Sequence, residues 1–288
     1  MKLSRSDADI YLPKLSRGLS VEAALARTTH LCVIAHQDDI EINAYPAVAE
    51  CHAQADRFFT GVVMTNGAGS ARTGKFAKTT DAEMQQIRRQ EQRTAADIGN
   101  YNLQLQLGHA SADVKRSDHP GVRADLSAIF RGCAPTLQVV YLHQPADKHD
   151  THVACFLRCL EAMRSLPRDQ RPRRVLGVEG WRNLDWLNDA DKVALDASPN
   201  PKLAEDLVKV FESQIAGGKR YDLAALGRRF SNATFFASHA TDSSTALSFA
   251  MDLTPLVQDE MLSPLDFALK HVDRFRSDVA ARLKQMGA

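Results

Sequence analysis

The chain has 288 residues and a net charge of +1 at pH 7, and 44% of its residues are hydrophobic. This length suits one large α/β domain, or one domain with an appendage. The balanced charge argues against a nucleic-acid or membrane-surface partner, because no overall field attracts either one.

The N-terminal segment MKLSRSDADIYLPKL has no continuous apolar core, so we expect no signal peptide. No apolar run approaches the ~20 residues that a membrane span requires. The five cysteines are odd in number and form no CxxC motif. We expect them to be reduced thiols in the core, as in a cytoplasmic protein.

The first third of the chain alternates strand and helix patterns. The apolar, β-branched run LCVIA predicts a strand, and FFTGVVMT predicts a second one. In chain order, the predicted elements are a strand at 31–35, a helix at 41–56, a strand at 58–65, a loop at 66–80 and a helix at 81–99.

The same alternation continues as far as Gly180. The predicted elements are a strand at 103–107, a helix at 122–131, a strand at 136–142, a helix at 152–166 and a strand at 174–179. Strands that alternate with helices predict βαβ units. We therefore expect a Rossmann-like, mainly parallel sheet flanked by helices.

Beyond Gly180 the alternation stops, and helices are predicted near 202–216 and 221–230. We predict that residues 1–180 form an α/β core. Residues 181–288 are expected to be a C-terminal subregion of the same domain, packed on the sheet and shaping the ligand pocket.

Two polar segments follow the first and fourth predicted strands, AHQDDIE at 35–41 and DKHDTH at 147–152. Their ionisable side chains are His36, Asp38, Asp39 and Glu41 in the first segment and Asp147, His149, Asp150 and His152 in the second. Open α/β sheets bind ligands beyond the carboxyl ends of their strands, where strand order reverses. We therefore predict that these two strands are neighbours and that the segments form one site.

Such a set of side chains suits a divalent metal ion. A hydrolytic zinc site takes three nitrogen or oxygen ligands and leaves one position open for water. His36 and Asp39 lie one helical turn apart, and His152 can complete the set. Asp38 points differently, which suits a base acting on the metal-bound water, whose pKa zinc lowers to about 7.

His149 lies one turn before His152 and can stabilise an oxyanion or protonate a leaving amine. Either Asp147 or Asp150 can hold its imidazole in the required tautomer.

Three motifs in this order resemble those of the PIG-L/LmbE-like zinc deacetylases. AHQDDIE is similar to the family's AHPDDE or AHxDDxE signature, and DKHDTH to its HPDH segment. IRRQEQRTAADIG, at 87–99, is similar to its RxxExxxAA helix. The resemblance covers roughly residues 30–180.

This resemblance implies a catalytic core and a function. Members of the family remove acyl groups, usually acetyl, from amino sugars and related N-acyl compounds. The match implies that His36, Asp39 and His152 bind zinc, that Asp38 is the general base and that His149 is the transition-state imidazole.

The chain also departs from the family pattern. Gln37 stands where the family usually has proline, and Thr151 replaces the aspartate of HPDH. The segment 42–48 lacks the glycine-rich stretch that usually follows the first motif. These departures bear on the substrate more than on the metal.

Several other polar residues are candidates for supporting or substrate-binding roles. Arg88 either pairs with a nearby glutamate or anchors a loop or substrate. Arg228 lies in a basic stretch that is either a solvated face or an anion pocket. The full set of supporting candidates is Glu41, Asn66, Arg72, Arg88, Asp147, Asp150, Arg228 and His239.

Other residues have open or no assignments. Trp181 and Trp186 either stack on a sugar or pack in the core, and the core is the favoured interpretation. No role is assigned to His109, His119 or His143.

The leading hypothesis is a cytoplasmic, zinc-dependent hydrolase that deacetylates a small N-acylated amino sugar or derivative, with or without an anionic group. The alternatives are an amidase acting on a larger N-acyl conjugate and a metal-binding sugar sensor with weakened catalysis. Iron(II), cobalt and manganese remain alternatives to zinc. Whether the chain forms homo-oligomers is left open.

Overall fold

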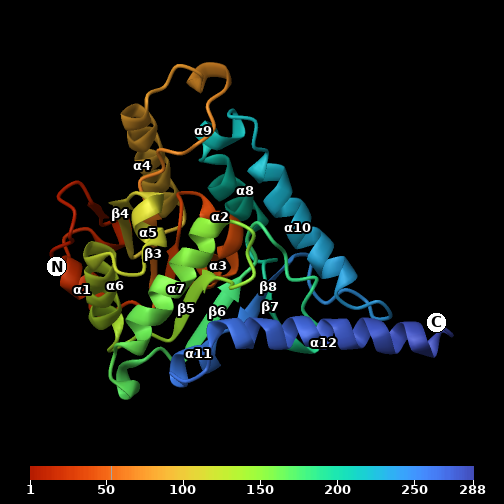
Figure 1. The fold of residues 1–288 in the computed structure, drawn as a ribbon. Helices are drawn as coiled ribbons and strands as arrows, with labels where there is room; N and C mark the ends of the chain where they lie inside the picture. The colour runs from red at the N-terminus through yellow and green to blue at the C-terminus, as the bar shows by residue number, and fades with distance from the viewer. Residues whose placement is uncertain (53) are drawn as a thin grey trace.

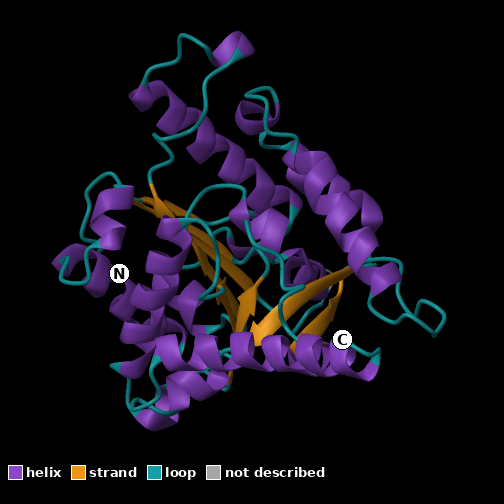
Figure 2. Ribbon diagram, turned by 45° about the vertical axis from the view of Figure 1, so that its right-hand side comes forward, coloured by secondary structure: helices purple, strands orange, loops and turns teal. Residues whose placement is uncertain are grey.

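A single sheet with helices on both of its faces runs through the protein, as the computed structural model shows (Figures 1 and 2). The structure describes residues 1–52 and 54–288. In chain order the strands are β1 (Asp9–Tyr11), β2 (His30–Ile34), β3 (Phe59–Thr65), β4 (Leu103–His109), β5 (Val139–His143), β6 (Arg174–Val178), β7 (Lys192–Asp196) and β8 (Leu247–Asp252). Across the sheet their order is β1-β4-β3-β2-β5-β6-β8-β7.

The helices occupy the connections between these strands and the C-terminal end. In chain order they are α1 (Val21–Ala26), α2 (Asp39–Asn43), α3 (Tyr45–His52), α4 (Asp81–Ile98), α5 (Ser111–Lys115), α6 (Pro120–Cys133), α7 (Asp150–Arg164), α8 (Pro201–Lys209), α9 (Glu212–Ile215), α10 (Tyr221–Phe235), α11 (Thr254–Gln258) and α12 (Pro264–Gln285).

The central strands β4, β3, β2, β5 and β6 are parallel, which confirms the predicted fold class. β2 and β5, the first and fourth predicted strands, are neighbours, as expected. Strand order reverses between them, because β3 and β4 lie on one side and β6 on the other. The carboxyl ends of β2 and β5 therefore flank the position where ligands of such sheets bind.

Strands β1, β7 and β8 were not predicted. β1 and β8 run antiparallel to their neighbours β4 and β6. β1 has only three residues, and β7 mixes half-buried with exposed positions, so neither gives a clear strand pattern. β7 and β8 lie beyond Gly180, so the C-terminal part of the chain extends the same sheet.

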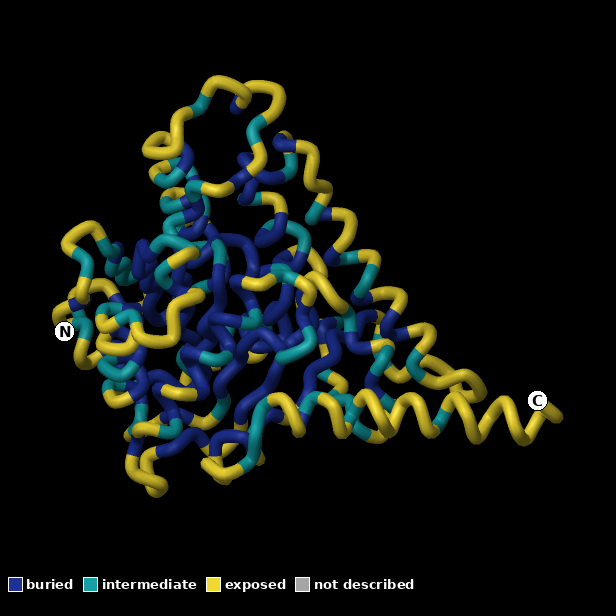
Figure 3. The backbone as a smooth tube through the Cα atoms, in the orientation of Figure 1, coloured by how far each residue is buried: buried dark blue, intermediate teal, exposed yellow. Residues whose placement is uncertain are grey.

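The core has two layers, one on each face of the sheet. Leu31 and Val33 of β2 pack with α6 and α7, whereas Cys32 and Ile34 pack with α3 and α8. This alternation follows from the two-residue period of a strand. Figure 3 shows the resulting buried interior, with most exposed positions on loops and on α12.

The predicted helix at 41–56 is wrong, because the structure has two helices there, α2 and α3, separated at Ala44. Pro46 lies in the first turn of α3, and proline lacks the N–H that a continuous helix would need at that position. By contrast, α4 begins where predicted. A capping box between Thr80 and Glu83 fixes its start.

All five cysteines are free and buried. Among the described residues, no helix combines the length and apolar character needed to cross a bilayer.

Candidate metal centre and substrate cavity

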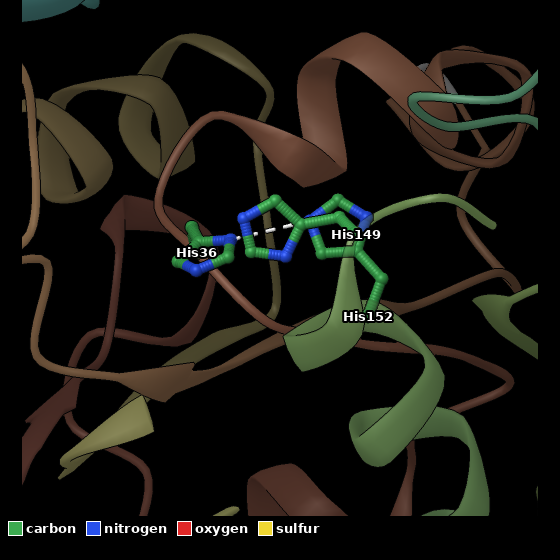
Figure 4. Close-up of side chains that lie close together, drawn as sticks. All are labelled: His36, His149 and His152. Carbon is green, nitrogen blue, oxygen red and sulfur yellow. Dashed lines mark hydrogen bonds between the residues drawn. The ribbon is translucent and has the colours of Figure 1, made fainter. Parts of the chain in front are cut away.

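The two predicted motifs converge at the switch point of the sheet. His36 follows β2 directly and Asp39 begins α2, while His149 caps the start of α7 and His152 lies in its first turn. Figure 4 shows the rings of His36, His149 and His152 gathered in one place. The expected convergence of segments far apart in the sequence is therefore confirmed.

Three side-chain atoms form a nearly equilateral triangle. The Oδ2 atom of Asp39 lies 3.2 Å from Nδ1 of His36 and 3.3 Å from Nε2 of His152. The two imidazole nitrogens are 3.3 Å apart. In a tetrahedral zinc site with bonds of about 2.0–2.1 Å, neighbouring ligand atoms lie roughly 3.3–3.4 Å apart. The spacing of these atoms therefore fits a zinc-sized ion.

Asp147 contacts the imidazole of His152 through Nδ1, the ring nitrogen that does not face Asp39. Its Oδ2 atom lies 3.3 Å from Nδ1 of His152 and accepts the N–H of Trp181 at 3.1 Å. Its Oδ1 atom accepts the backbone N–H of His149 at 2.9 Å. Asp147 thus orients the ring of His152, not that of His149, which corrects the expectation from the sequence.

Asp150 takes no part in this cluster. Its side chain is 89% exposed, and its carboxylate lies 4.0 Å from Nζ of Lys115. As the first residue of α7, it points into solvent, so it does not orient His149.

The pKa values of His152 and Asp39 are shifted in opposite directions, and both shifts favour the charged forms. Burial opposes a charge on His152, but Asp39 and Asp147 outweigh it and raise the pKa of His152 to about 10. Burial likewise opposes ionisation of Asp39, yet His152, His36 and His143 hold the pKa of this carboxyl well below its usual range. Asp39 and Asp147 therefore favour a positive charge at His152.

Asp38 lies beside this triangle in a constrained backbone conformation. Its φ of 85° is unusual for a residue other than glycine, and its N–H donates to Oε1 of Gln92 at 3.2 Å. Burial raises the pKa of Asp38 well above its usual range; Arg88 opposes this shift and Asp39 adds to it. Such a carboxyl readily accepts a proton.

Arg88 contacts the Asp38 side chain, the loop after β3 and the backbone of the first motif. Its guanidinium lies 3.2 Å from Oδ2 of Asp38, donates to Oγ of Ser70 at 2.6 Å and donates to the carbonyl of Gln37. Glu91, a glutamate one helical turn from Arg88, instead accepts hydrogen bonds from Ser213. Of the two interpretations of Arg88, the structure supports loop anchoring.

Glu41 does not line the cavity, but it is connected to Asp38 through hydrogen bonds. It is fully buried and accepts hydrogen bonds from Tyr101 at 2.7 Å and from Gln92 at 2.8 Å. Burial raises its pKa to about 7. Gln92 thereby links Glu41 to the backbone of Asp38.

His143, to which the sequence assigned no role, belongs to this cluster. It is the last residue of β5, and its Nε2 accepts the N–H of Ala35 at 3.0 Å and lies 3.6 Å from Oδ2 of Asp39. Its ring stacks on His152 with centroids 3.8 Å apart. The sequence does contain a signal for His143: it ends β5, the strand that pairs with β2.

A cavity of about 610 Å³ lies over these residues. The two motifs, the loop after β3 and the N-terminal half of α10 line it. Asn66 lines it too, although its Oδ1 atom also accepts the N–H of Ala68 in a turn. The C-terminal part of the chain contributes the outer wall: Trp181, Lys219, Tyr221 and Arg228.

Trp181 faces this cavity and is 38% exposed, so the favoured assignment to the core is wrong for this residue. Its ring lies 6.2 Å from that of His149 and 5.9 Å from that of Tyr221. The ammonium of Lys219 lies 5.3 Å from the Trp181 ring. Trp186, in contrast, packs against the core, as expected.

Two other candidates lie away from the cavity. Arg72 donates to the carbonyls of Ala68, Ser70 and Thr79 and thus holds the loop after β3 in shape. His239 lies in an exposed turn after α10. Neither lines the cavity, so the structure lends no support to substrate contact by Arg72 or to proton transfer by His239. Arg228 does line the cavity and donates to the carbonyl of Gly180 at 2.6 Å.

The structure resembles several solved structures. A conserved protein from Thermus thermophilus matches with a TM-score of 0.61 and 18% identity, covering 82% of this chain and 99% of that one. The N,N'-diacetylchitobiose deacetylase from Pyrococcus horikoshii matches with a TM-score of 0.61 and 16% identity, covering 81% and 86%. The 4-carboxy-2-hydroxymuconate hydratase from Pseudomonas putida matches with a TM-score of 0.57 and 18% identity, covering 78% and 96%.

At these identities the likeness shows a common fold only. Among curated proteins, no sequence match was found. The family model described as GlcNAc-PI de-N-acetylase (PIG-L) matches residues 31–163, which include both histidine-containing motifs. The resemblance drawn from the motifs is therefore confirmed: residues 31–163 of this chain are a domain of the PIG-L family.

Proposed function

We propose that this chain is a metal-dependent N-deacetylase, a hydrolase of linear amide C–N bonds that removes an N-acetyl or other N-acyl group from an amino sugar or related small molecule. One observation carries the proposal: the triangle of His36, Asp39 and His152 lies beside Asp38 under a cavity of about 610 Å³. The family of the domain supports amide hydrolysis at this site.

The three triangle residues would hold the metal, and zinc fits their donor types and spacing best. When bound, zinc lowers the pKa of a water molecule to about 7 and polarises the amide carbonyl. Asp147 keeps His152 oriented for this role, as carboxylates behind ligand histidines commonly do.

Asp38 acts as the general base. It takes the proton of the attacking water, and its raised pKa lets it hold that proton and pass it to the departing amine. Arg88, 3.2 Å away, keeps the carboxylate in place.

His149 stabilises the oxyanion as a neutral donor. Its Nδ1 atom accepts the N–H of Thr151 at 3.3 Å, so the proton of the neutral ring lies on Nε2. Burial lowers the pKa of His149, which favours this neutral form.

The outer wall of the cavity suits an amino sugar with an anionic group. Trp181 offers an aromatic face to a sugar ring. Lys219 and Arg228 line the same wall and can bind a phosphate or carboxylate. The volume is in the range of pockets for small ligands, which favours a small substrate over a large conjugate. The buried free cysteines support a cytoplasmic location.

The test combines metal analysis of wild type and His152→Ala with product assays. The substrates are N-acetylated amino sugars, each with and without a phosphate or carboxylate. We expect about one zinc ion per wild-type chain, loss of the metal in the variant and acetate release that is fastest with anionic substrates.

Two results would contradict the proposal. One is a metal that persists in His152→Ala, which would place the ion elsewhere. The other is a protein that binds metal and releases no acetate but adds water to unsaturated acids. That is the reaction class of the structurally similar hydratase. A metal-loaded protein that binds sugars without turnover would support the sensor alternative.

A further inference from the structure

Helix α12 extends away from the body of the molecule (Figures 1 and 3). It has 22 residues and is therefore about 33 Å long. Only Phe267 of this helix is buried. Two further contacts fix its first half, since Asp191 lies 3.6 Å from His271 and 2.6 Å from Arg274.

An exposed apolar stripe runs along this helix. Its side chains are each at least 37% exposed and recur at intervals of three or four residues: Leu265, Leu269, Val272, Phe275, Val279, Leu283 and Met286. At 3.6 residues per turn, these positions lie on one side, roughly opposite Phe267 and Arg274, which face the body.

The stripe is not explained by the fold of a single chain. A contiguous apolar surface of this kind marks an interaction site. In proteins, most of the stability of a helix comes from packing of its amphipathic face rather than from intrinsic propensity. Phe267 and Arg274 place the other side of α12 against the body of the molecule, and the stripe stays exposed in the single chain.

The spacing of the stripe identifies the kind of partner. Leu265, Val272, Val279 and Met286 recur every seven residues, and this heptad repeat is typical of helices that pair in coiled coils. A heptad stripe fits another helix with the same repeat. A second copy of this chain supplies such a helix, its own α12.

The charges on α12 set the direction of pairing. Asp266 lies in its first turn, whereas Arg282 and Lys284 lie in its last turn, and the charges between these ends largely balance. In an antiparallel pair the first turn of each helix, with Asp266, lies beside the last turn of the other, with Lys284, and the helix dipoles oppose favourably. A two-fold axis near Phe275 also places Leu265 against Met286 and Val272 against Val279 of the second copy.

We propose that α12 is a dimerisation helix, through which two copies of this chain pair in antiparallel orientation along the apolar stripe. The interface is separate from the metal cluster, so the proposal does not depend on the proposed function.

The first test measures the mass of the full chain in solution by sedimentation equilibrium, from about 1 to 100 µM. We expect about twice the chain mass of 31.8 kDa. Val272→Glu with Val279→Glu should give the mass of one chain. The control, Ser277→Glu with Gln285→Glu, adds the same charge to exposed positions off the stripe and should remain dimeric. Far-UV circular dichroism of both variants checks that the helix persists.

The second test fixes the orientation by disulfide cross-linking. The five native cysteines are buried, so an introduced surface thiol is the reactive one. Phe275→Cys should cross-link with itself, and Leu265→Cys should cross-link with Met286→Cys but not with itself. Asp266→Lys and Lys284→Asp should each weaken the dimer about fivefold, and the double variant should restore it.

A monomeric wild type at every concentration would overturn the proposal, as would a dimer that survives Val272→Glu with Val279→Glu. Self-cross-linking of Leu265→Cys would overturn the antiparallel arrangement.

Discussion

At the scale of single residues, Asp38 and Asp39 are adjacent carboxyls with opposite proton affinities. Histidines surround Asp39 and lower its pKa, whereas burial dominates at Asp38 and raises its pKa. Their backbones differ too, because Asp38 has a positive φ and Asp39 begins α2. The two neighbouring carboxyls are thereby suited to different tasks: Asp39 to binding a cation and Asp38 to accepting a proton.

This division predicts the behaviour of Asp38→Asn. Asparagine tolerates positive φ, so the backbone should be preserved, but an amide cannot accept the proton. We expect the metal content to stay at the wild-type level and kcat to fall by about 10²–10⁴-fold. Elemental analysis and steady-state kinetics measure the two quantities. Unchanged kcat would remove Asp38 from the mechanism.

His152 makes the stability of the metal-free protein depend on pH. Its pKa of about 10 in the folded state exceeds the value of about 6.5 expected when unfolded. Stabilisation from its bound proton is thus complete below about pH 6.5 and is lost as pH rises towards about 10. We expect the free energy of unfolding of the metal-free protein to decline across this window in urea titrations.

Asp147→Asn provides the control for this pH dependence, because it removes one of the two carboxylates that raise the pKa of His152. The decline between about pH 6.5 and 10 should become shallower in this variant. A slope equal to that of the wild type would show that His152 does not carry the effect.

At the scale of elements, the loop after β6 packs against Asp147, on the side of His152 that faces away from Asp39. Gly180 follows this strand, and a Cβ atom there would lie 2.2 Å from Oδ2 of Asp147. The same oxygen accepts the N–H of Trp181 and contacts His152. Glycine is required because only a bare backbone leaves room for this carboxylate.

Gly180→Ala should therefore displace Asp147 and weaken metal binding by about 10–100-fold, the usual effect of losing the support behind a ligand histidine. Gly227→Ala in α10 is the matched control, since nothing lies within 4 Å of its added Cβ. Alanine is also the better helix former there, so this variant should be stabilised slightly. Competition with a chromogenic chelator measures both affinities, and equal affinities would exclude the proposed role of Gly180.

The elements predicted best from sequence are those with the strongest local patterns. β2 and β5 are continuous apolar runs, and each ends at a polar motif, so the sequence was sufficient to predict their adjacency and the convergence of His36 with His152. His143 was missed because a histidine at a strand end shows no partner until the neighbouring strand is known. β7 and β8 depend on long-range pairing, which no local pattern encodes. Helix α12 was not predicted, although its apolar residues recur at helical spacing in the sequence.

At the scale of the whole molecule, the residues proposed to hold the metal come from both halves of the parallel sheet. His36 and Asp39 extend from β2, His152 belongs to the helix that follows β5, and Gly180 follows β6. A ligand bound by such separate segments is bound by the folded chain and not by the unfolded one. Metal binding should thus stabilise the entire fold rather than one loop.

Removal of the metal should lower the unfolding temperature of the whole chain in one transition. With free zinc at about 100 times its dissociation constant, the expected stabilisation is about 2.7 kcal/mol, or roughly 5 °C for a chain of this size. Calorimetry with and without a chelator measures the shift. His152→Ala should show no shift, whereas Asp38→Asn should show that of the wild type, because Asp38 is not assigned as a ligand. A shift that persists in His152→Ala would mean that the stabilising ion binds outside the triangle.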